Sequence, residues 1–133
     1  MNPQTVFYIL IGIISAKFLF DTYLNELNSR HFNDTIPNEL EGIYNEDEYL
    51  KSQKYKKSNH QFSLITSLFS IVITLSFFIF EGFAFVDSLA KSFSNNTILI
   101  TLIFFGIILF TSDILNLPFS VYKTFVIEEK FGF

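Results

Sequence analysis

The chain contains no cysteine, and only two of its 133 residues are histidine. Without cysteine it can form neither a disulfide framework nor a thiolate zinc site, and its redox compartment cannot be read from the sequence. His31 is followed by Phe32, and His60 by Gln61. The metalloprotease motif H-E-x-x-H, in which two imidazoles one helical turn apart hold the metal, is therefore absent. We expect this chain to supply no catalytic residue, no metal ligand and no cofactor.

Basic residues are also few. Nine Lys and Arg stand against thirteen Asp and Glu, and the formal net charge is −4. A protein that binds nucleic acid needs a basic surface to neutralise phosphates, and this composition offers none. We expect no nucleic-acid partner.

Apolar residues are abundant. Half of the chain is hydrophobic, 19 residues are Phe, and the mean hydropathy is +0.38. This is too apolar for a water-soluble domain of this length. Three apolar runs each approach the length that crosses a bilayer, and we expect spans at about 4–23, 62–81 and 98–117. The predicted fold is an all-α integral membrane domain with the lipid bilayer as its first partner.

A polar stretch, 24–61, separates the first two spans, with its acidic residues first and its basic residues last. We expect a loop containing two short helices with a break near Ile36-Pro37. Basic residues gather in this loop and after the third span, whereas the connection between spans two and three has only Lys91. The positive-inside rule then places the loop in the cytoplasm and Met1 outside.

Small polar residues recur along the second span. Ser63, Ser67, Ser70 and Thr74 lie at intervals of four, three and four residues, which places them on one helical face. Such a face either packs against a neighbouring helix or lines a water-filled chamber. In the third span, Asp113 and Asn116 raise the same question, because an ionisable residue within a span is costly and usually functional. The alternative is that Asp113 lies at the membrane boundary or is satisfied by Asn116 and the backbone.

The last stretch, 118–131, begins with Pro118, which is tolerated in a first helical turn. A helix starting there would place Phe119, Tyr122 and Phe125 on one face. We therefore expect an interfacial amphipathic helix, with an ordinary amphipathic connector as the alternative.

This stretch resembles a known family. The residues Leu117-Pro118-Phe119, Tyr122, Thr124-Phe125-Val126-Ile127-Glu128-Glu129-Lys130 and Gly132-Phe133 are similar to the end of the N-terminal membrane region of type I CAAX prenyl proteases. Upstream, Tyr23-Leu24-Asn25, Ile36-Pro37-Asn38-Glu39-Leu40 and the run 48–55 resemble the loop after the first helix of these integral-membrane zinc metalloendopeptidases. The resemblance assigns structural roles to Pro118, Tyr122, Phe125, Glu128, Glu129 and Gly132.

The resemblance implies that residues 1–133 form one membrane domain, the N-terminal part of a larger protease. The implied partners are the downstream catalytic region, which would carry zinc and seat against Phe119, Tyr122 and Phe125, and prenylated or other membrane peptides. The expected location is a bacterial cell membrane. A different class of function stays open, that of a stand-alone small membrane protein acting as a scaffold or interaction partner without chemistry.

Overall fold

The computed structural model describes residues 2–30, 32 and 45–132 of the chain, with the side chain of residue 46 excepted. These residues form four α-helices and one π-helix: α1 (Pro3–Ser29), α2 (Glu46–Ile79), α3 (Gly82–Phe93), α4 (Thr97–Tyr122) and η2 (Lys123–Glu128). No strand occurs among the described residues. Three helical stretches, Pro3–Ser29, Asp47–Ile79 and Thr97–Glu128, are long and apolar enough to cross a membrane. The predicted all-α membrane fold is confirmed.

Asparagine begins each of the three long helices. The side chains of Asn2, Asn45 and Asn96 accept hydrogen bonds from backbone N–H groups in the first turns of α1, α2 and α4. These N–H groups have no partner within the helix, and a capping oxygen stabilises each helix by about 1 kcal/mol. The caps therefore mark where each helix begins.

The long helices extend beyond the predicted spans. Within the predicted loop 24–61, residues 24–29 belong to α1 and residues 46–61 to α2. The predicted break near Ile36-Pro37 lies outside the described residues. The helix start predicted at Pro118 is wrong, because α4 runs through this proline and continues into η2. In a membrane helix, neighbouring side chains and local changes of helix geometry can satisfy the backbone carbonyl that a proline leaves without its donor.

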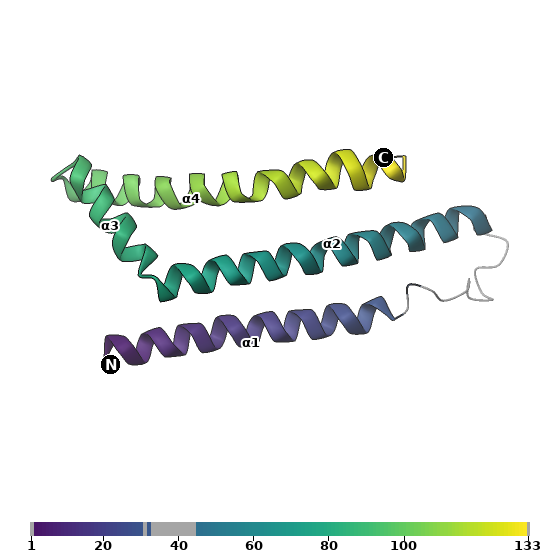
Figure 1. Cartoon of the computed structure of the whole chain (residues 1–133), viewed down its shortest axis with the longest axis horizontal. Coiled ribbons are helices and arrows are strands. Elements are labelled where there is room, and N and C mark those ends of the chain that lie inside the picture. The colour runs from purple at the N-terminus through teal and green to yellow at the C-terminus, as the bar shows by residue number, and fades with distance from the viewer. Residues whose placement is uncertain (1, 31, 33–44, 133) are drawn as a thin grey trace.

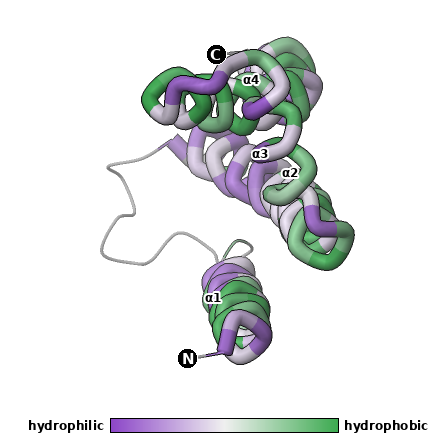
Figure 2. The backbone as a smooth tube through the Cα atoms, turned by 90° about the vertical axis from the view of Figure 1, so that its left-hand side faces the viewer, coloured by the Kyte–Doolittle hydropathy of each residue, from purple (hydrophilic) through white to green (hydrophobic). Residues whose placement is uncertain are grey.

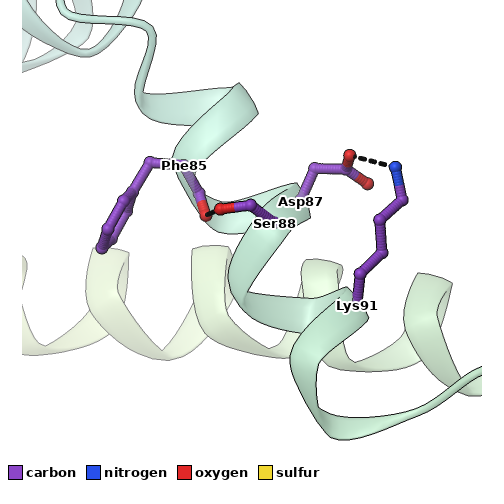
Figure 3. A network of polar contacts seen from close by, with 4 residues as sticks. All are labelled: Phe85, Asp87, Ser88 and Lys91. Carbon is purple, nitrogen blue, oxygen red and sulfur yellow. Dashed lines mark hydrogen bonds and ion pairs between the residues drawn. The ribbon is translucent and has the colours of Figure 1, made fainter.

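The connection between the second and third spans is itself a helix, α3. Its apolar side buries Val86 and Ala90, which are 5% and 0% exposed. Its polar groups are satisfied along the helix, where Lys91 pairs with Asp87 and the Ser88 hydroxyl donates to the Phe85 carbonyl at 2.8 Å (Figure 3). This amphipathic pattern suits a helix with one face against its neighbours.

Each of the three long helices runs in the opposite direction to the long helix before it, so α1 and α4 run left to right in Figure 1 and α2 runs right to left. α1 packs along α2, with the Phe7 and Phe78 rings 6.4 Å apart at one end and Glu26 facing His60 at the other. Figure 2 shows α1 standing apart from α4. α2 and α4 converge toward the C-terminal end, and α3 bridges them where they diverge. The result is a wedge between α2 and α4.

The described residues bury little apolar surface against one another. Val86, Ala90, Ile127 and Phe131 are their only buried hydrophobic residues, whereas large apolar side chains such as Leu19, Phe80 and Phe110 are well over half exposed. In water this exposure would oppose folding. In a bilayer the lipid tails cover these side chains, which agrees with the membrane assignment.

Candidate functional site

A cavity of about 220 Å³ lies in the wedge between α2, α3 and α4. Its walls are mostly apolar, with Phe77, Phe78 and Phe83 closing it toward α3. A smaller set of its lining residues is polar: Ser70, Thr74, Thr111, Ser112 and Asn116. An apolar pocket with a few convergent polar groups is the usual form of a small-molecule or substrate site.

The predicted serine-threonine face is divided between two places. Ser70 and Thr74 line the cavity. Ser63 instead lines a separate cleft between α1 and α2, and Ser67 is half-buried outside both. The structure therefore brings only the C-terminal half of this face into the cavity.

α4 contributes the predicted Asn116 together with two polar residues that the sequence prediction omitted, Thr111 and Ser112. Asn116 lines the cavity, and its side-chain amide donates to the Ser112 carbonyl at 2.9 Å. The sequence could have predicted Ser112, because it is four residues from Asn116 and the two therefore share a helical face. Asp113 is exposed and does not line the cavity. The hydrogen-bond partner of the Asn116 amide is thus Ser112.

Aromatic rings close the narrow end of the wedge. The Phe119 ring lies 4.9 Å from that of Phe69, and Tyr122 stacks on Phe62 at 5.5 Å with an interplanar angle of 19°. Phe125 is instead 66% exposed. The three rings that were predicted to seat against the downstream catalytic region therefore do not act together. Two of them, Phe119 and Tyr122, pack on α2 of the same chain. Aromatic pairs of this kind stabilise the packing by about 1 kcal/mol each, beyond what burial of the rings contributes.

The last residues fold against the start of α2. The Phe131 and Tyr55 rings are 5.4 Å apart, and Phe131 is 7% exposed. Gly132 has a φ of +77°, a conformation that favours glycine, and a Cβ there would lie 3.4 Å from the Lys51 Nζ. Of the paired carboxylates, Glu128 is half-buried and Glu129 is exposed.

The aromatic contacts follow a sequence signal. Tyr55, Phe62 and Phe69 lie one heptad apart on α2, and each meets a ring from the C-terminal part of the chain. A seven-residue apolar repeat is typical of a seam between two helices. This repeat could have identified the α2 surface that contacts α4.

The described residues do not provide a set of zinc ligands. His60 lies on α2 with its Nε2 3.7 Å from the Glu26 Oε2, and this histidine side chain is only 12% exposed. Across residues 2–30, 32 and 45–132, no three His, Cys, Asp or Glu side chains gather as metal ligands. His31 lies outside the described residues. A catalytic zinc needs three protein ligands, so one histidine and one carboxylate do not fit it.

Comparison with known proteins places the chain in a family. The family profile "CAAX prenyl protease N-terminal, five membrane helices" matches residues 26–133. CAAX prenyl protease 1 of Saccharomyces cerevisiae is 29% identical over 136 residues, with 94% of this chain and 30% of the relative covered. The Mus musculus homolog is 32% identical over 125 residues, with 87% and 26% covered.

A solved structure agrees with this match. The crystal structure of S. mikatae Ste24p superimposes with a TM-score of 0.88 at 27% identity, and the alignment covers 100% of this chain and 32% of that one. The chain thus spans about 30% of the length of the relatives it matches. These relatives come from eukaryotes, so they lend no support to a bacterial membrane. This chain belongs to the CAAX prenyl protease family, of which it forms the N-terminal membrane domain.

Proposed function

We propose that this chain is the membrane scaffold of a CAAX-prenyl-protease-like zinc metalloendopeptidase. The observation that carries the proposal is the match of residues 26–133 to the N-terminal family domain, together with the superposition of the whole chain on Ste24p. The chain does not contain H-E-x-x-H, so the chemistry falls to a downstream region of the same protein. That region would carry the zinc and cleave prenylated or other membrane peptides.

The scaffold's contribution is a wall of the reaction chamber. The cavity in the wedge supports this role, because hydroxyl and amide groups of Ser70, Thr74 and Asn116 line a hollow between otherwise apolar helices. Polar side chains in a membrane domain usually face the protein interior or a water-filled space. Phe125, which is exposed, remains available to the downstream region, whereas Phe119 and Tyr122 hold α4 to α2.

The orientation follows from the positive-inside rule. Basic residues at the end of α1, at the start of α2 and in the C-terminal turns lie at one end of the molecule, and the α3 end carries only Lys91. The residues of the first group are Arg30, Lys51, Lys54, Lys56, Lys57, Lys123 and Lys130. The end that holds the α1–α2 connection would therefore face the cytoplasm, with the N-terminus on the opposite side.

The test is to read the coding sequence beyond the codon for Phe133. An in-frame H-E-x-x-H is expected, and the longer product should then bind zinc and cleave a prenylated peptide when the chain alone does not. A stop codon at this point in the mature transcript would contradict the proposal. The chain would then be a stand-alone membrane protein without peptidase chemistry.

A further inference from the structure

α3 has a second apolar surface, which the other described helices leave uncovered. Val86 and Ala90 are buried, whereas Phe85 and Phe93 are 67% and 70% exposed. Leu89, which is only partly exposed, lies midway between these two residues in the sequence. Residues four apart share a helical face, so Phe85, Leu89 and Phe93 form one continuous stripe along α3. We call these three residues the outer stripe.

The other side of α3 is polar. Asp87 and Lys91 form an ion pair one turn apart, and Figure 3 shows this pair projecting to the side of the helix opposite to Phe85. The Ser92 hydroxyl donates to the Leu89 carbonyl at 2.7 Å, so it is satisfied within the helix. A helix divided in this way is suited to a boundary between an apolar and an aqueous phase.

α3 lies beside parts of the spans whose exposed side chains are apolar. It contacts α4, and Figure 1 shows that α4 begins farther to the left than α2 ends, with α3 alongside the first part of α4. Ile98 and Leu102 in this part of α4 are 72% and 63% exposed, and Phe80 at the end of α2 is 80% exposed. In a bilayer, lipid covers such side chains. The outer stripe therefore lies at the depth of the lipid-facing surface rather than beyond the ends of the spans.

Charge around α3 offers little to a particular lipid headgroup. Residues 81–97 contain three charged side chains, Glu81, Asp87 and Lys91, which give a formal net charge of −1. Recognition of anionic lipids relies on clusters of Lys and Arg, and this segment has one lysine that is already paired. Contact between the outer stripe and a bilayer would therefore come from apolar burial and would not depend on headgroup charge.

We propose that α3 lies in the boundary between lipid and water, with the outer stripe against acyl chains and the Asp87–Lys91 side in water. The partner of this surface is the bilayer itself, whichever headgroups it carries. The other possible occupants are a further segment of the same protein and a second copy of the chain, and both would keep the outer stripe away from lipid. This inference depends on the membrane fold and does not depend on the proposed peptidase.

The first test uses tryptophan fluorescence. The chain contains no tryptophan, so a single introduced indole reports only on its own surroundings. Phe85→Trp and Phe93→Trp place the indole on the outer stripe. Ala84→Trp is the matched control, because Ala84 is exposed, adjacent to Phe85 in the sequence and turned by about 100° around the helix. Each protein is placed in phosphatidylcholine nanodiscs, where brominated acyl chains quench indoles that touch lipid and iodide quenches those that touch water.

Brominated lipid should quench the two outer-stripe tryptophans severalfold more strongly than the tryptophan at position 84, and iodide should quench them in the reverse order. Replacing phosphatidylcholine by anionic phosphatidylglycerol should leave both patterns unchanged, because the outer stripe is uncharged.

A second measurement uses smaller side chains, since an indole is larger than the ring it replaces. The chain contains no cysteine, so Phe93→Cys and Lys91→Cys each introduce the single thiol of the protein. A water-soluble maleimide should label position 91 severalfold faster than position 93. Far-UV circular dichroism of all five variants checks that their helical content is unchanged.

Four results would each overturn the proposal. Equal iodide quenching at positions 84, 85 and 93, without an effect of brominated lipid, would place both sides of α3 in water. Quenching by brominated lipid that requires phosphatidylglycerol would show that headgroup charge holds the helix. Loss of this quenching when two chains share a disc would make a second copy the occupant. Its loss in a longer product of the same gene would make a further segment of the protein the occupant.

Discussion

Replacement of Ala90 tests whether α3 packs closely against its neighbours at the wide end of the wedge. Its side chain is 0% exposed between α3 and its neighbours. Replacing it with Leu adds an isopropyl group where no space remains, and overpacking of this kind costs about 1–3 kcal/mol. For a chain of this length each kcal/mol corresponds to roughly 3–5 °C in melting temperature. We therefore expect Ala90→Leu to lower the midpoint by about 3–15 °C.

The same helix provides the control. Ala84 is exposed on α3, so Ala84→Leu makes the identical chemical change without a packing partner. Its effect should stay within about 0.5 kcal/mol. Far-UV circular dichroism in detergent reports the helical unfolding of both variants. Equal midpoints for the two leucine variants would refute the close packing of α3, and with it the closed end of the wedge.

Four further predictions follow from particular residues. Ser70→Leu and Ser70→Ala should have nearly equal unfolding midpoints because Ser70 lines a cavity, and a selective loss in the leucine variant would indicate tight helix packing instead. Glu81 has a φ of +56°, so Glu81→Gly should be more stable than Glu81→Ala by about 1 kcal/mol in thermal unfolding, and the opposite order would contradict the left-handed turn. In intact cells a membrane-impermeant thiol reagent should label Asn95→Cys but not Lys54→Cys, and the reverse pattern would invert the proposed topology. The purified chain should retain no stoichiometric zinc after dialysis and cleave no peptide, whereas zinc retention with chelator-sensitive cleavage would show that ligands converge unexpectedly.

The fold class was predictable because bilayer thickness sets the length of a spanning helix. Runs such as Ile98–Leu117 need only be counted to be identified. The helix ends were less predictable, because polar helices continue past the membrane boundary. The start of α2 at Glu46 precedes its apolar run by several turns. The position of Pro118 within a continuous helix was not predictable for a related reason. Whether a proline interrupts a helix depends on the neighbouring turns as well as on the preference of proline for the first turn.

The site was only partly predictable. Helical periodicity correctly grouped Ser70 with Thr74, because these two residues lie on one face. It could not predict which half of that face lies toward α4 and which half toward α1. Ser63 therefore lines a different cleft from the one that was expected. That division depends on how α2 is placed between α1 and α4, which contacts between different helices determine. Periodicity within one helix carries no information about such contacts.

The π-helix η2 changes how the end of the chain should be aligned with its relatives. Phe119 and Tyr122 contact α2, and regular helical spacing would place the next contacts near positions 126 and 130. The buried residues are instead Ile127 and Phe131, each one position later. η2 begins directly after Tyr122 and includes Ile127, and its wider turn accommodates one additional residue. The end of the chain is therefore a regular helix with a single-residue insertion. A relative that lacks one residue between Lys123 and Val126 can present the same side chains to α2 through an unbroken α-helix.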